Sequence, residues 1–110
     1  MNRIRKQELL DTVKAFIASA DFHLSYVKTF FGMGIDVLDE IKELEKQKVF
    51  FESWLRVNPP VSGAATTVEL QQNANRMAVE CRLSDIMDKL VLCNALKELN
   101  DNKINIEKLL

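Results

Sequence analysis

Residues 67–99, TVELQQNANRMAVECRLSDIMDKLVLCNALKEL, belong to the longest stretch of the chain without glycine or proline. Two lines of mainly apolar residues follow this stretch at helical spacing. The first line is Leu70, Ala74, Met77, Cys81 and Ser84, and the second is Val79, Leu83, Ile86, Leu90 and Cys93. Because a helix that is apolar on two lines contacts neighbours on two sides, the stretch predicts one long helix over 67–99 inside a helical bundle.

Both ends of this predicted helix carry boundary signals. Thr66 and Glu69 have the spacing of a capping box, in which a hydroxyl and a carboxylate satisfy opposite backbone donors. The run Asn100-Asp101-Asn102 is expected to end the helix. The tail 104–110 is apolar enough to dock, and a short C-terminal helix is one alternative for it.

The residues before the loop predict a helical hairpin over 3–57. Leu9, Val13, Phe16, Ala20, Leu24, Val27 and Phe31 mark an uninterrupted helix over 3–31. Gly32-Met33-Gly34 is expected to end it, and a second helix follows until Pro59-Pro60 stops it. Since short links give antiparallel neighbours, we expect an all-α fold with three long helices in an up-down-up bundle, as a single domain over 1–110.

The predicted lengths leave residues 90–99 without a partner. The third helix would be about 50 Å long against about 33 Å for the second, so its end would extend beyond the Gly32–Gly34 turn. A break in the helix, cover by the tail, or cover by a second copy would each bury this apolar segment. We expect a homo-oligomer, most simply a two-fold dimer.

The amino-acid composition narrows the class of protein further. Apolar residues make up 47% of the 110 residues and charged residues 28%, which is typical of a globular domain. The net charge of −1 and the interspersed signs disfavour broad nucleic-acid binding. No apolar run approaches the ~18 residues of a membrane span, and Glu8 and Asp11 interrupt any signal-peptide core. We expect a cytoplasmic protein.

The chain shows no pattern for catalysis, a cofactor or a metal. His23 is the only histidine, and together with Cys81 and Cys93 it falls short of the roughly four ligands of a structural zinc site. The cysteines would lie about 18 Å apart along one helix, too far for a disulfide, and are expected to be buried thiols. No dinucleotide, phosphate-loop or nucleophile-elbow motif occurs. We therefore expect a protein that is not an enzyme.

Aromatic and leucine side chains suggest a protein-binding surface instead. Phe50 and Trp54 are one helical turn apart and can share a patch, where large aromatic residues dominate binding energy. Cover by the third helix is the alternative for them. The predicted protein-binding residues are Phe30, Phe50, Trp54, Leu92, Leu96 and Leu99.

The leading hypothesis is a protein-interaction module that buries an apolar helix face against a protein partner. A small adaptor, a chaperone, or an inhibitor encoded by a phage or mobile element fits this class. The alternative is a dimeric nucleic-acid-associated regulator with a basic N-terminal arm of Arg3, Arg5 and Lys6, whose binding would weaken steeply with salt.

Overall fold

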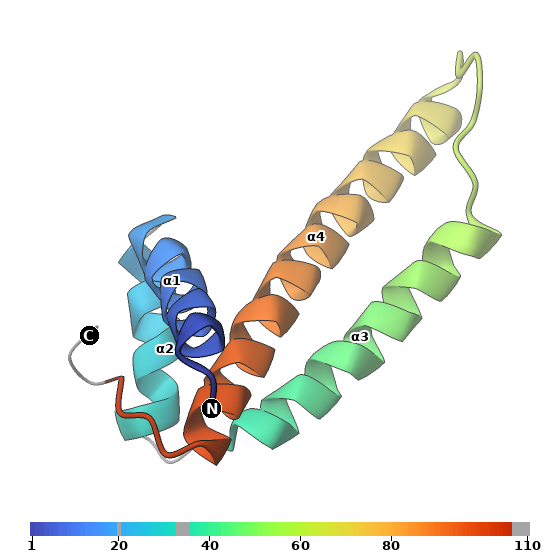
Figure 1. Ribbon diagram of the computed structural model, residues 1–110. Helices are drawn as coiled ribbons and strands as arrows, with labels where there is room; N and C mark the ends of the chain where they lie inside the picture. Colours follow the sequence, from blue (N-terminus) through green and yellow to red (C-terminus); the bar gives the residue numbers. More distant parts are fainter. Residues whose placement is uncertain (20, 33–35, 107–110) are drawn as a thin grey trace. The chain divides into compact units, whose positions relative to one another are not determined.

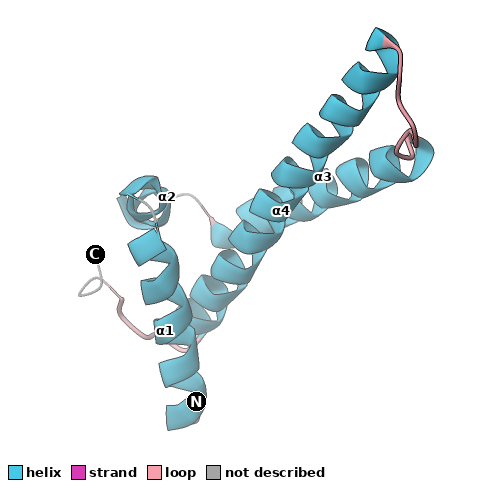
Figure 2. Cartoon of the chain, turned by 90° about the horizontal axis from the view of Figure 1, so that it is seen from above, coloured by secondary structure: helices cyan, strands magenta, loops and turns pink. Residues whose placement is uncertain are grey.

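The computed structural model describes residues 1–19, 21–32 and 36–106, without the side chains of 21–23 and 31–32. Within these residues the chain forms four α-helices and no strand (Figures 1 and 2). The helices are α1 (Arg3–Ser19), α2 (Asp21–Gly32), α3 (Val37–Val57) and α4 (Thr67–Asp101). The all-α prediction is confirmed, and α4 matches the helix predicted over 67–99 almost residue for residue.

The prediction of one helix over 3–31 is wrong. α1 ends at Ser19, α2 begins at Asp21, and the two helices contact each other. At the end of α1 the Ser19 hydroxyl donates a 2.7 Å hydrogen bond to the carbonyl of Phe16. Such serine bonds compete with the helical ladder and bend or end helices. α2 ends at Gly32 as predicted, whereas Met33 and Gly34 lie outside the described residues.

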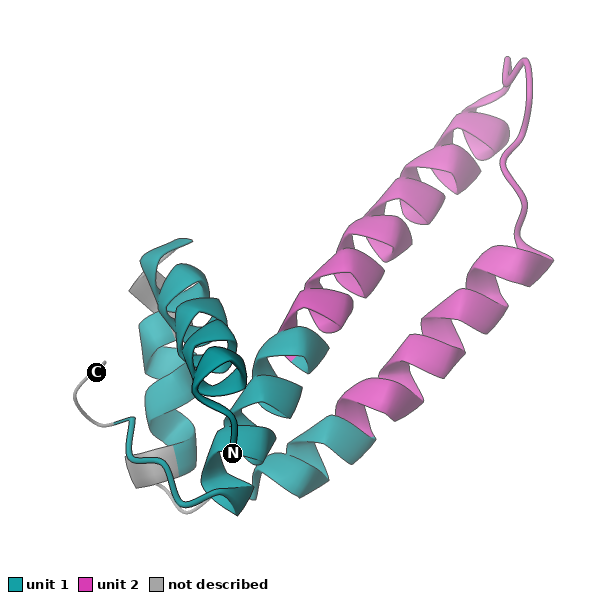
Figure 3. Cartoon of the chain, in the orientation of Figure 1, with its two compact units in different colours: residues 1–42, 90–110 teal, residues 43–89 magenta. Residues whose placement is uncertain are grey.

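The chain divides into two compact units (Figure 3). Unit 1 comprises residues 1–42 and 90–110, and unit 2 comprises residues 43–89. Both α3 and α4 pass from one unit into the other without a break. Each of these two helices therefore has one part in unit 1 and another part in unit 2.

Unit 1 contains most of the buried apolar side chains. They are Leu9, Val13, Val27, Phe30, Ile41, Leu90, Leu92, Cys93, Ala95, Leu96, Leu99 and Ile106. The expectation that residues 90–99 lack a partner inside the chain is thus wrong for most of that segment. Because α2 is a separate helix and the tail returns, this chain itself covers Leu92, Leu96 and Leu99, and they need no second copy.

A polar contact links three helices of unit 1. The Tyr26 hydroxyl on α2 donates to Glu40 Oε1 on α3 at 2.9 Å and lies 3.6 Å from Cys93 Sγ on α4. Burial, followed by the contacts with Cys93 and Glu40, raises the pKa of Tyr26 well above its ordinary value. The neutral hydroxyl is therefore held as a hydrogen-bond donor, and the contact fixes how these helices meet.

A capping turn ends α4. Lys103 has a φ of 56°, and the Ile104 amide donates to the Leu99 carbonyl at 3.0 Å. This left-handed residue with a long return bond is the Schellman arrangement. The turn directs the chain back, and Ile106 is buried. Residues 102–106 form no helix, and the rest of the tail, where a short helix was one alternative, lies outside the described residues.

Candidate protein-binding surface

Unit 2 is a helical hairpin in which Arg76 joins the two helices. Its Nη1 donates to the carbonyls of Leu55 at 2.8 Å and Asn58 at 2.7 Å. The last carbonyls of a helix have no partner within that helix, and positive charge there also complements the helix dipole. Glu80 pairs with the Nε of Arg76 at 3.2 Å and holds the guanidinium in place. One side chain of α4 therefore caps the end of α3.

Asn73 fixes the loop 58–66 that connects the helices. Its Oδ1 accepts from the Val61 amide at 2.8 Å, and its Nδ2 donates to the Val61 carbonyl at 3.0 Å. This pair of bonds satisfies both backbone groups of one loop residue. The roles of Arg76 and Asn73 were not predicted, because no local sequence signal indicates which distant carbonyl a side chain will reach.

The predicted capping box at the start of α4 is confirmed. The Glu69 amide donates to Thr66 Oγ1 at 3.2 Å, and the Thr66 amide donates to Glu69 Oε1 at 3.2 Å. The Thr66 hydroxyl also donates to that carboxylate at 2.8 Å. These hydrogen bonds from Thr66 hold the pKa of Glu69 below its usual range. The cap sets where α4 begins and so where its first side chains lie beside the loop.

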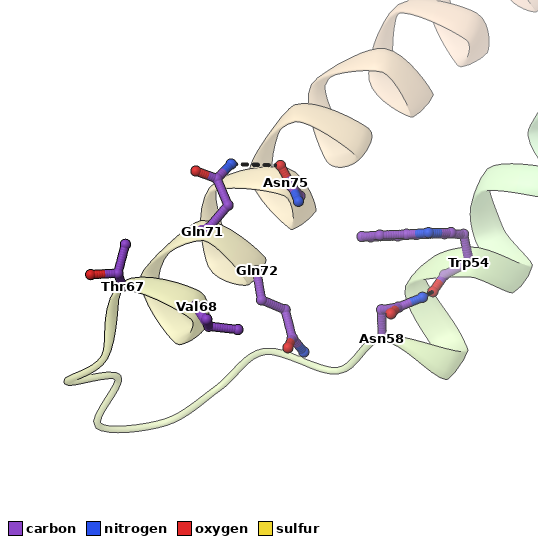
Figure 4. A pocket seen from close by; sticks show the side chains of 7 residues that line it. All are labelled: Trp54, Asn58, Thr67, Val68, Gln71, Gln72 and Asn75. Carbon is purple, nitrogen blue, oxygen red and sulfur yellow. Dashed lines mark hydrogen bonds between the residues drawn. The ribbon is translucent and has the colours of Figure 1, made fainter.

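A pocket of about 490 Å³ opens between the helices near the loop (Figure 4). Trp54 and Asn58 of the α3 side face residues from the first turns of α4 across it. The lining residues are Trp54, Asn58, Thr67, Val68, Gln71, Gln72 and Asn75. None of them is charged, so an aromatic face and a rim of amides are available to a ligand side chain.

A second pocket of about 320 Å³ lies further along the hairpin. Phe50 and Phe51 meet there edge to face, with ring centroids 5.4 Å apart, and the Arg82 guanidinium lies 5.9 Å from the Phe51 centroid. Glu43, Lys46 and Gln47 complete the lining together with these three residues. Two cations against one carboxylate give this end a positive balance.

Both pockets lie on the same flank of the hairpin. Seven lining residues come from α3 and from Asn58 just after it, and five of them are spaced by 4, 3, 4 and 4 positions, which is one helix face: Glu43, Gln47, Phe50, Trp54 and Asn58. On α4 the spacing from Val68 through Asn75 to Arg82 is two heptads. We call the lining residues of the two pockets together the Phe50–Trp54 flank.

The structure separates the six predicted protein-binding residues into two groups. Phe50 is 63% exposed, and Trp54 is half-buried, and both line the Phe50–Trp54 flank. Phe30, Leu92, Leu96 and Leu99 are buried in unit 1, although Phe30 and Leu96 also line a pocket of about 310 Å³ there. Only Phe50 and Trp54 are therefore presented together at a surface.

The predicted basic arm is partly neutralised. Arg5 Nη2 lies 2.7 Å from Glu98 Oε2, and Nη1 lies 3.3 Å from Glu8 Oε2. These bonds raise the pKa of Arg5, and the bond from Arg5 holds the pKa of Glu98 below its usual range. Arg3 and Lys6 are exposed. Of the three cations, Arg5 is therefore already paired with carboxylates of this chain, Glu8 and Glu98.

The cysteines occupy different environments. Cys93 is buried, as expected, but Cys81 is exposed, so the prediction of two buried thiols is wrong for Cys81. The His23 side chain lies outside the described residues. Among the described side chains, no group of three His, Cys, Asp or Glu is placed to hold a metal ion.

Across the described ranges, no helix is both long enough and apolar enough to cross a membrane. Comparisons with protein families, with curated proteins and with solved structures find no match to this chain.

Proposed function

We propose that this chain is a non-enzymatic protein-interaction module that binds a partner helix along the Phe50–Trp54 flank. The supporting observation is the imbalance in unit 2. Among its described residues, Leu44 and Ile86 are buried apolar side chains, whereas seven large apolar side chains are exposed: Val49, Phe50, Val57, Val68, Leu70, Met77 and Met87. Two helices alone cannot bury two apolar faces, and of these seven side chains Phe50 and Val68 line the Phe50–Trp54 flank together with Trp54.

The flank has the features of a site for an amphipathic helix. Such helices place apolar anchors into a groove at i, i+3, i+4 and i+7, and the two pockets are aligned along the helix axes. The pocket at Trp54 accepts an apolar anchor, and its amide rim supplies hydrogen bonds. Lys46 and Arg82 at the other end favour an acidic side chain on the partner. A small adaptor, chaperone or inhibitor would act in this way.

The test uses two neighbouring residues of nearly equal exposure. Phe50 is 63% and Val49 62% exposed, but they point about 100° apart around α3. A photoreactive residue placed at Asn75, which lines the pocket on the side of α4 away from the Leu70–Met77 line, should form a discrete crosslink to one protein in cells that express the chain. The F50A change should reduce this product at least about tenfold, because aromatic anchors dominate binding energy, whereas V49A should leave it unchanged.

Two outcomes would refute the proposal. If F50A and V49A have the same effect, the flank is not the binding surface. If crosslinking from Asn75 is no more selective than crosslinking from the exposed Lys28 of unit 1, the hairpin does not present a specific site. Both changes affect exposed side chains, so circular dichroism should show an intact helical fold in each variant.

A further inference from the structure

The first apolar line of α4 is exposed along its whole length. Leu70 is 56% and Met77 66% exposed, and Ala74, Cys81 and Ser84 between and beyond them are exposed as well. The spacing of apolar residues predicts neighbours on both lines of α4. Only the second line has them: Ile86 and Leu90 are buried, and Val79 and Leu83 are half-buried. That part of the prediction is wrong for the first line within this chain.

The spacing of the exposed line is that of a helix–helix seam. Its steps of 4, 3, 4 and 3 residues repeat every seven positions, which keeps the residues facing one partner helix. No residue of the line is charged, and the next position in the repeat is Asp88. The seam lies entirely in unit 2, on a part of α4 without a break. A partner must offer an uncharged helix of similar length.

We infer that a second copy of this chain occupies the seam, with the two α4 helices antiparallel. In one register every layer pairs a large side chain with a small one: Leu70 faces Cys81 of the second copy, and Met77 faces Ala74. Thr67 and Ser84 close both ends of the contact. Alternating large and small side chains across facing positions is how helices interdigitate without voids.

Charge favours the antiparallel arrangement over the parallel one. In a parallel pair the repeat would place Asp88 against Asp88 of the second copy, which is repulsive. In the antiparallel register the overlap ends at Ser84, and the flanking positions pair Asn73 with Glu80 and Gln71 with Asp85. No like charges face each other there.

Most of the seam lies away from the Phe50–Trp54 flank, which it meets at Thr67 and Gln71, two lining residues of the pocket at Trp54. Val68, Asn75 and Arg82 of the flank lie more than 90° around α4 from the line through Leu70, Met77 and Ser84. The inference therefore does not rest on the proposed function. It also differs from the dimer expected from sequence, which was based on residues 90–99.

Cysteine crosslinking tests the register. In the antiparallel pair the two native Cys81 residues are about 16 Å apart along the seam, beyond the roughly 7 Å between Cα atoms that a disulfide allows. The variant L70C places a new thiol opposite Cys81 of the second copy. Under mild oxidation L70C should run as a dimer on a non-reducing gel, while the unaltered chain and V68C, whose new thiol lies off the seam, should run as monomers. Equal crosslinking of all three, or stronger crosslinking of the unaltered chain, would overturn the register.

Sedimentation equilibrium tests the association itself. The unaltered chain should show a reversible monomer–dimer equilibrium, since a single seam of four to five turns is a small interface. M77E should raise the dissociation constant at least about 100-fold, because each dimer would bury two unpaired charges. V68E and F50A should leave the constant unchanged. A chain that stays monomeric up to about 1 mM would overturn the inference, even if F50A abolishes partner crosslinking.

Discussion

Arg76 shows how one side chain can hold two helices together. Three acceptors surround its guanidinium: the carbonyls of Leu55 and Asn58 and the Glu80 carboxylate. Its side chain is 21% exposed, so its charge is only partly screened by water. In unit 2, Leu44 and Ile86 are the buried apolar residues among those described, so polar contacts such as those of Arg76 are needed to hold α4 to the end of α3.

Replacing Arg76 by methionine should therefore destabilise the protein. R76M keeps most of the apolar stem but removes two hydrogen bonds from a charged donor, each worth about 1.5–3 kcal/mol, so we expect the free energy of unfolding to fall by at least about 3 kcal/mol in urea titrations. R56M, in the exposed last turn of α3, is the matched control and should change it by less than about 0.5 kcal/mol. Equal losses in the two variants would contradict this role for Arg76.

α4 is one helix whose two parts lie in different surroundings. Residues 67–89 form one arm of the two-helix hairpin, and residues 90–101 pass through the core of unit 1. Leu92, Cys93 and Leu99 are buried there, whereas Leu70 and Met77 are exposed. The backbone hydrogen bonds of α4 continue along the whole helix, but buried side chains surround them mainly in residues 90–99.

We expect hydrogen exchange to divide α4. Amides of residues 92–99 should exchange only with global unfolding, and those of 70–80 should exchange at least about tenfold faster through local opening, because opening free energy follows buried contacts. Exchange should be followed by NMR at dilute concentration, where a second copy does not protect the seam. Uniform protection along α4 would show that unit 2 is as stable as unit 1.

Unit 1 contains most of the buried apolar core, whereas unit 2 contains most of the large apolar side chains that are exposed. Twelve of the fourteen buried apolar residues described lie in unit 1, drawn from four helices and the tail. Unit 2 contains both pockets of the Phe50–Trp54 flank and the α4 seam. The residues that stabilise the fold thus lie mainly in unit 1, and both surfaces that we propose for binding lie in unit 2.

This division predicts opposite outcomes for two leucines of α4. Leu92 is 1% exposed, so L92A should lower the free energy of unfolding by about 2–5 kcal/mol through lost transfer energy and a residual cavity. L70A, at an exposed position, should change it by less than about 0.5 kcal/mol at dilute concentration. Thermal or urea denaturation of the two variants measures the difference, and a comparable loss for L70A would place Leu70 in the folded core.

Spacing along the chain is enough to predict the features that depend only on nearby residues. The capping box of Thr66 and Glu69, the length of α4 and the shared face of Phe50 and Trp54 follow from spacing, because a helix repeats every 3.6 residues wherever it packs. α2 ends at Gly32, at the glycine-containing link that the sequence marks.

Which apolar faces are covered depends on how the helices pack. The two apolar lines of α4 look alike in sequence, yet one packs and the other is exposed. The leucines expected at a surface, Leu92, Leu96 and Leu99, lie in the core because α1 and α2 are separate helices that pack within unit 1. Burial depends on residues far away along the chain, and the hydrophobic effect has no direction, so a local pattern marks an apolar face but does not specify its partner.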